Sequence, residues 1–167
     1  MIMKPERTEE ATSDTQYVRM RRCLSESVAT PRWPDDAYLK TFSELHAPAA
    51  HALLKLAYAH GGGSVASFEE WWQGLSGDAE YEPALCFPVH GAEDRIIGFC
   101  QCWTTAFVKD LIVHPGYQRR GVGSALLLHA FQAFADRGAK TVDLKVRGNN
   151  HAAIRFYESL GMYRLPI

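Results

Sequence analysis

Hydrophobic and polar positions follow different periods along the chain. Residues 1–15 are polar and have little to bury, so we expect a tail there. Partial alternation of apolar and charged residues predicts a first strand over 17–24. Over 35–58, apolar residues recur at near-helical spacing around Pro48, which predicts two helical pieces. A pattern like a capping box at Ser67 predicts one more short helix.

The second half changes to short β-rich runs between turns, with helical spacing in two places. Three consecutive antiparallel strands are expected at 84–89, 95–103 and 107–113, then a helix, a strand and a helix at 124–137, 141–146 and 150–160. Strand, helix, strand, helix indicates α/β layering. At most one short strand fits after Gly161. No internal repeat or linker interrupts 16–167, so one domain is expected.

Composition narrows the class of protein. The chain of 167 residues is 47% hydrophobic and 22% charged, which suits a packed globular domain. Its formal net charge of −1 gives no overall positive field for nucleic acid or an anionic membrane. No segment resembles a membrane span or a signal peptide, so we expect a cytoplasmic protein. The four cysteines lack the C-x-x-C spacing of metal and redox sites, so reduced, packed thiols and no metal are expected.

A strand, a glycine-rich turn and a helix follow one another directly after Leu111. Gly121 and Gly123 lie at the helix start, where free backbone N–H groups and the helix dipole favour an anion. The pattern therefore predicts phosphate binding. Val122 stands where a Walker A loop needs lysine, and Leu126 where a dinucleotide fingerprint needs a small residue. Neither a nucleoside triphosphate nor NAD is favoured.

The turn Gln118-Arg119-Arg120-Gly121-Val122-Gly123 resembles the Gln/Arg-x-x-Gly-x-Gly/Ala signature of the GNAT superfamily of acyl-CoA-dependent N-acyltransferases. A second block, Asn150-x-x-Ala153-x-x-Phe156-Tyr157-x-x-x-Gly161-Met162, is similar to the superfamily's later helix. The resemblance covers 95–162 well, whereas 17–94 agrees only in the order of its elements. Residues 16–167 are therefore identified as a single GNAT-like acetyltransferase domain.

The resemblance implies the fold and the cofactor site. The implied fold is α/β (α+β), with a mixed, mostly antiparallel sheet, helices on both faces, and a V-shaped splay between the strands near 107–113 and 141–146. Acetyl-CoA is the implied co-substrate, without a metal. Its pantetheine arm would pair with backbone groups of Leu111, Ile112 and Val113, and Asn150 would hydrogen-bond it. Its pyrophosphate would be held by the amides of Gln118, Arg119, Arg120, Gly121, Val122, Gly123 and Ser124, with the two arginines assisting electrostatically.

The implied chemistry is direct transfer of an acetyl group to an amine. It needs a neutral amine, a stabilised oxyanion and a proton for the departing thiolate. Tyr157 occupies the position where many members keep a general acid, and it is our leading catalytic residue. Because an ordinary tyrosine is less acidic than a thiol, its alignment matters more than its acidity. A backbone N–H near Ile112 is the expected oxyanion donor.

The general base follows no clear pattern. Several relatives place a glutamate on the strand that enters the cofactor loop, where this chain has Lys109 and Asp110. We rank Asp110 first, with Glu69, Glu70 or a water chain as alternatives, and a purely structural pairing of Asp110 with Lys109 is equally compatible. Lys109 is expected to be solvated. His114 is expected to be structural.

The acceptor is expected to be a primary amine of a small molecule or peptide. The acidic residues before the sheet mildly favour a cationic acceptor; they are Glu69, Glu70, Asp78 and Glu80. The tryptophans Trp71, Trp72 and Trp103 are candidates for lining its pocket, although core packing is their commoner role. The alternative function is a noncatalytic acyl-CoA-binding or sensing module. An exposed sheet edge after the last helix leaves a homodimer as a hypothesis.

Overall fold

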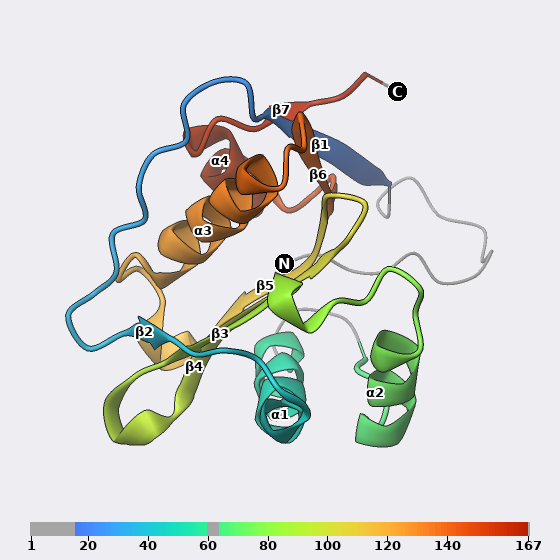
Figure 1. Cartoon of the computed structure of the whole chain (residues 1–167), viewed down its shortest axis with the longest axis vertical. Coiled ribbons are helices and arrows are strands. Elements are labelled where there is room, and N and C mark those ends of the chain that lie inside the picture. Colours follow the sequence, from blue (N-terminus) through green and yellow to red (C-terminus); the bar gives the residue numbers. More distant parts are fainter. Residues whose placement is uncertain (1–15, 60–63, 167) are drawn as a thin grey trace.

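The computed structural model describes residues 16–59 and 64–166, and the predicted tail at 1–15 lies outside them. The strands are β1 (Tyr17–Cys23), β2 (Tyr38–Leu39), β3 (Cys86–His90), β4 (Ile96–Trp103), β5 (Phe107–Val113), β6 (Thr141–Arg147) and β7 (Tyr163–Arg164). The α-helices are α1 (Ala47–Tyr58), α2 (Phe68–Ser76), α3 (Val122–Asp136) and α4 (His151–Ser159). One mixed sheet has the order β2-β3-β4-β5-β6-β1-β7, with α1 and α2 on one face and α3 and α4 on the other (Figure 1). The expected fold class is confirmed.

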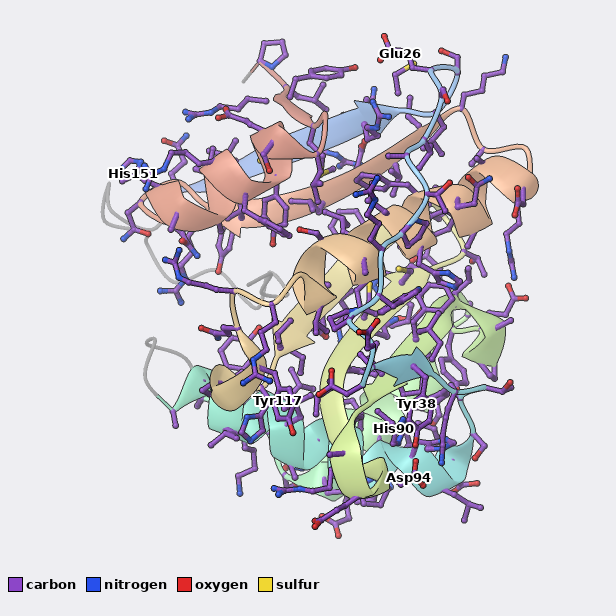
Figure 2. The ribbon with its side chains drawn as sticks, turned by 90° about the vertical axis from the view of Figure 1, so that its left-hand side faces the viewer. Glu26, Tyr38, His90, Asp94, Tyr117 and His151 are labelled. Carbon is purple, nitrogen blue, oxygen red and sulfur yellow. The ribbon has the colours of Figure 1, made fainter. Side chains whose placement is uncertain are left out.

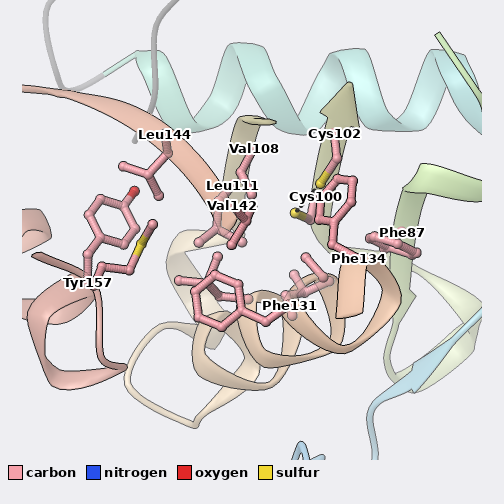
Figure 3. Packing of buried hydrophobic residues seen from close by; sticks show 14 of the residues in the cluster. Phe87, Cys100, Cys102, Val108, Leu111, Phe131, Phe134, Val142, Leu144 and Tyr157 are labelled. Carbon is pink, nitrogen blue, oxygen red and sulfur yellow. Dashed lines mark hydrogen bonds between the residues drawn. The ribbon is translucent and has the colours of Figure 1, made fainter. Parts of the chain in front are cut away.

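The alternation of side chains along the strands produces two cores, one on each face of the sheet. The larger lies under α3 and α4 and includes Phe131, Phe134 and Leu144 (Figure 3). The smaller lies under α1 and α2 and includes Phe99 and Ile112. Cys100 and Cys102 share the first face, with their Sγ atoms 3.7 Å apart and no bridge, as predicted.

Strands β5 and β6 form the only parallel pair among the described strands, and they separate early. Two residue pairs join them, Phe107 with Asp143 and Val108 with Leu144. Beyond these pairs each strand continues for several residues without the other. The predicted splay between 107–113 and 141–146 is therefore confirmed, and the facing backbone groups of β5 are available to a ligand.

The first strand of the chain lies between the last two. β1 pairs antiparallel with β6 along its whole length and with β7 at Met20 and Arg21. The strand itself was predicted, but its partners, which are more than a hundred residues away in sequence, were not. Both described edges of the sheet, β2 and β7, are two residues long, and such shortness limits pairing with another chain.

The helical piece predicted from residue 35 is wrong. Tyr38 and Leu39 instead form β2 against β3, where Tyr38 donates a hydrogen bond to Asp94 and stacks on His90 (Figure 2). Pairing with a sheet edge therefore overrides a local helical period. Pro48 does not interrupt a helix; it lies in the first turn of α1, where its missing N–H costs nothing.

Asp143 holds β1 and β6 together through charge. Its carboxylate is 4% exposed and accepts hydrogen bonds from the Nε atoms of Arg21 at 2.7 Å and Arg19 at 2.8 Å. Burial raises its pKa, but these hydrogen bonds outweigh that effect and leave the pKa below its ordinary value.

We expect Asp143→Asn to lower the free energy of unfolding by about 2 kcal/mol at pH 7. Because the folded pKa is depressed, this stabilisation exists above the ordinary carboxyl pKa of ~3.9 and is lost as pH falls through the folded pKa. Urea unfolding at pH 7 and at pH 3 measures it, with the exposed Asp136→Asn as the control. An equal loss at both pH values would contradict the assignment.

Candidate active site

The turn between β5 and α3 forms an open anion cradle. His114 begins it by accepting a hydrogen bond at Nδ1 from the Gly116 amide at 2.9 Å, which is the structural role expected of this histidine. Gly121 caps α3 with φ at 89°, a left-handed conformation that favours glycine. The cap carries no side-chain hydrogen bond, and the first helical bond runs from Ala125 N to Gly121 O. The amides that precede it therefore have no acceptor within the helix.

A pocket of about 550 Å³ adjoins this cradle and runs between α3, α4 and β5. Of the residues predicted to bind the cofactor, it is lined by Leu111, Ile112, Val113, Gln118, Arg119, Gly121, Gly123, Ser124 and Asn150. Figure 2 looks onto this side of the molecule, which carries Tyr117 in the turn and His151 at the start of α4.

Two of the predicted residues do not line the pocket. Arg120 places its guanidinium over the Tyr117 ring, 5.2 Å from the centroid. Val122 is 1% exposed and packs its side chain in the core, so it can offer only its backbone amide. Arg119, by contrast, lines the pocket and has a positive φ of 61°.

The register of β5 decides which backbone groups face the splay. The His114 amide donates to Ile97 O on β4, and hydrogen-bonded positions alternate along an antiparallel pair. The Ile112 backbone therefore pairs with β4, whereas the backbone groups of Leu111 and Val113 face away from β4. Gln118 Nε2 approaches Val113 O at 3.5 Å from that side. The Leu111 N–H thus replaces that of Ile112 as the candidate oxyanion donor.

Asn150 and Tyr157 come from the two ends of α4. Asn150 caps the helix, because its Oδ1 accepts a hydrogen bond from the Ala153 amide at 3.1 Å. Tyr157 is 1% exposed and points into the core toward Leu144, at the inner end of the pocket (Figure 3). Burial, followed by the nearby Cys100 and Asp110, raises the pKa of its hydroxyl. Tyr157 therefore stays protonated at neutral pH.

Asp110 opens onto a second pocket of about 300 Å³, on the α1 and α2 side of β5. A bulge shifts the register of β4 and β5 between Gln101 and Cys102, so Lys109 and Asp110 both line this pocket. Asp110 is 6% exposed, and burial raises its pKa above that of an ordinary carboxyl. A carboxylate with a raised pKa is a stronger base.

The expectation that Lys109 is solvated is wrong. Its side chain is 13% exposed, its Nζ lies 3.6 Å from Asp110 Oδ2, and it sits over the Trp103 ring at 5.2 Å. The bulge turns Lys109 inward, which strand alternation could not indicate. Its charge lowers the pKa of Asp110 against the larger effect of burial. The pair is therefore both a structural contact and a control on the basicity of Asp110.

Tyr58 is a candidate site residue that sequence reasoning missed. It lies at the end of α1, lines the second pocket and hydrogen-bonds Asp110. Ala57 beside it lines the first pocket, so the two pockets meet at this turn of α1. Burial, then Asp110 and Tyr157, raise the pKa of Tyr58. The three titratable groups lie close together where β5 leaves β6.

The other candidates for the acceptor side lie on α2, and only some of them face the second pocket. Glu70 and Trp71 line the second pocket, whereas Glu69 does not. Trp72 packs between Phe42 and Tyr81 instead. Ser67 caps the helix by accepting from the Glu70 amide, as the sequence predicted.

Neither a metal site nor a membrane span is found in the part of the chain that the structure describes. No cluster of three or more His, Cys, Asp or Glu side chains there could hold a metal ion. None of the described helices is both long and apolar enough to cross a bilayer.

Comparisons with known proteins all find acetyltransferases. The model of the acetyltransferase (GNAT) family matches residues 47–162. The [ribosomal protein bS18]-alanine N-acetyltransferase of Escherichia coli K12 is 50% identical over 62 residues, which cover 37% of this chain and 42% of that protein. The chain thus spans less than half the length of this curated relative.

Solved structures agree. A GCN5-related N-acetyltransferase from Sphaerobacter thermophilus has a TM-score of 0.74 and 24% identity, covering 89% of this chain and 48% of that one. The alanine N-acetyltransferase of ribosomal protein S18 from Escherichia coli has a TM-score of 0.62 and 28% identity, covering 75% and 76%.

Proposed function

The chain belongs to the GNAT acetyltransferase family, and on that basis we propose that it transfers an acetyl group from acetyl-CoA directly to a primary amine. The observation that carries the proposal is the meeting of two pockets at the splay, one with a phosphate cradle and one with a buried carboxylate of raised pKa. Donor and acceptor can then approach β5 from opposite faces of the sheet.

The first pocket fits acetyl-CoA. Backbone amides at the start of α3 and the Arg119 side chain suit a pyrophosphate. Backbone groups of Leu111 and Val113 suit the amides of an extended pantetheine arm, as a neighbouring strand would. Acetyl-CoA supplies the activated acetyl group as its thioester, and no metal is part of the proposal.

Each proton movement has a candidate residue. Asp110, from the acceptor side, takes a proton from the ammonium or the attacking amine. The Leu111 N–H stabilises negative charge on the carbonyl oxygen as the amine adds. Tyr157, from the α4 side, gives its proton to the departing sulfur. Lys109 and Tyr58 hold Asp110 in place and limit the rise of its pKa.

The cradle can be tested by placing charge in it. A Cβ at Gly123 would lie 3.5 Å from Val113 and 3.6 Å from Phe156, both at the pocket, so it fits without moving backbone. We expect Gly123→Ala to bind CoA nearly normally and Gly123→Asp to bind it about thirtyfold more weakly, because the carboxylate repels the phosphates. Equilibrium dialysis with CoA measures both. Equal affinities would remove the cradle from the proposal.

The alternative is a noncatalytic acyl-CoA-binding or sensing module. A thiol-release assay with acetyl-CoA over polyamines, amino acids, aminoglycosides and peptides separates the two. Acceptor-dependent release of CoA supports transfer, whereas CoA binding with no release for any amine supports the module. The position of Asp110 favours transfer, because a binding module needs no buried base on the far side of the sheet.

The named target of the curated relative, alanine of a ribosomal protein, supports a peptide amine as the acceptor and the cytoplasm as the location. Small amines remain in the assay panel as competitors. A homodimer also remains a proposal, and light scattering over a dilution series would exclude it by showing monomer throughout.

A further inference from the structure

A cationic strip occupies the sheet face beyond α1 and α2. Arg19 and Arg21 of β1 alternate with buried positions and share this face with Lys145 and Arg147 of β6, where Lys145 is the register neighbour of Arg19 and Arg147 that of Tyr17. In Figure 1, β1 and β6 lie away from both α1 and α2, so neither helix covers them. The cationic strip therefore consists of Arg19, Arg21, Lys145 and Arg147, and all four side chains are at least partly exposed.

Two of these cations share one carboxylate of the strip. Asp143 binds both Arg19 and Arg21. Among residues 16–59 and 64–166, Lys145 has no ion-pair partner. Arg19, Arg21 and Lys145 with the single carboxylate of Asp143 thus give the strip an excess of positive charge, in a chain whose overall net charge is −1. This excess is local, which argues for a local ligand rather than a long polyanion.

The strip is continuous with the acceptor side of the active site. Arg19 lies over the Phe107 ring of β5 at 5.8 Å, two residues before Lys109. Arg147 and its register neighbour Tyr17 lie close enough to Tyr58 to influence its pKa. A chain leaving the second pocket along β6 therefore passes Arg147 and then Lys145, about 7 Å further along the strand.

Charge along this path changes sign. The pocket is lined by two carboxylates, Asp110 and Glu70, and by one cation, Lys109, so its excess of negative charge suits an ammonium group. The strip that follows presents cations. A peptide with acidic side chains shortly after its amino terminus complements both parts. A polyamine complements only the first, and the cationic acceptor favoured by the acidic residues near α2 would be repelled by the second.

Resting on the proposed transfer activity, we infer that the acceptor is the amino terminus of a peptide carrying aspartate or glutamate within its first few residues, bound by the cationic strip. The extended length of the strip favours such a segment over a single carboxylate. Opposite charges placed this way select the substrate and mainly affect its KM.

Matched peptides test the inference. Three share an amino-terminal alanine and differ at positions 2 to 4, which hold glutamate, glutamine or lysine. With saturating acetyl-CoA, we expect kcat/KM to be about fivefold higher for the glutamate than for the glutamine peptide, and lowest for the lysine peptide. Added salt is expected to reduce the difference, because the strip is exposed.

Two variants locate the effect. The first variant is Lys145→Gln, and the second combines Lys145→Gln with Arg19→Gln. Both are expected to abolish the preference for the glutamate peptide while leaving the rate with the glutamine peptide within about twofold. The control is Arg95→Gln, which changes an exposed arginine just before β4, on the far side of the sheet order from β1 and β6, and should keep the preference. Thermal unfolding verifies that each variant folds.

The outcomes are distinct. CoA release from all three peptides at equal rates, or a preference that survives both strip variants, overturns the inference and leaves the transfer activity intact. Tighter binding of an oligonucleotide than of the glutamate peptide, lost in the same variants, also overturns it. No release from any peptide or small amine instead defeats the proposed function itself.

Discussion

Asp110→Asn is expected to lower kcat by about 10²- to 10⁴-fold, the range of a general base, with little change in the affinity for CoA. The amide is nearly isosteric but cannot take a proton from the amine. Asp110 lines the acceptor pocket and not the cofactor pocket, so donor binding is preserved. Steady-state rates and equilibrium dialysis measure the two effects separately.

The pH profile distinguishes a base from a structural carboxylate. Because burial raises the pKa of Asp110, the acid limb of kcat/KM should lie above the ordinary carboxyl range, and Asp110→Asn should remove it. Lys109→Met removes a charge that lowers this pKa and should move the limb to higher pH. An amine acceptor of low pKa keeps its own titration out of this range. Activity within threefold of the parent in Asp110→Asn would assign the base elsewhere.

Tyr157→Phe is expected to lower kcat by about 10²- to 10³-fold and to leave CoA affinity unchanged. Its hydroxyl lies at the inner end of the cofactor pocket, and its raised pKa keeps it protonated, so it can donate to the departing thiolate. The ring fills the core in either residue, so packing is preserved. Stopped assays of thiol release, beside dialysis with CoA, give the required comparison.

Tyr163→Phe serves as the control for Tyr157→Phe. Tyr163 is 48% exposed on β7, so losing its hydroxyl should change neither kcat nor stability. If Tyr157→Phe loses CoA binding in parallel with kcat, the tyrosine is a packing residue. If it keeps both, another group protonates the thiolate.

The cofactor side of the site could be predicted from sequence because it is local. The strand, turn and helix between Leu111 and Ser124 are contiguous, and the requirement for a left-handed residue at Gly121 is visible in the sequence. Asn150 is equally local: the sequence placed it at the start of a helix, and the structure shows it as the N-cap of that helix. Periodicity, caps and glycines act over a few residues, and that is the range over which they are informative.

The acceptor side could not be predicted because it depends on distant contacts. Tyr58 reaches Asp110 from a helix more than fifty residues earlier, with no local pattern to mark it. Lys109 turns inward only because of a bulge opposite Gln101 and Cys102. The cationic strip requires β1 to lie beside β6, a pairing that the alternating arginines of β1 did not indicate. The helix predicted from residue 35 was wrong for the same reason, because β2 forms only by pairing with β3.

The central claim is that the two pockets at the splay join acetyl-CoA to an amine. Mass spectrometry of an amino-terminal alanine peptide, incubated with the protein and acetyl-CoA, tests it most directly when free CoA is quantified in the same sample. One acetyl group gained on the terminal amine for each CoA released, both abolished in Asp110→Asn, is the predicted result. Tight binding of acetyl-CoA with no acetylated product from any peptide or small amine would contradict it.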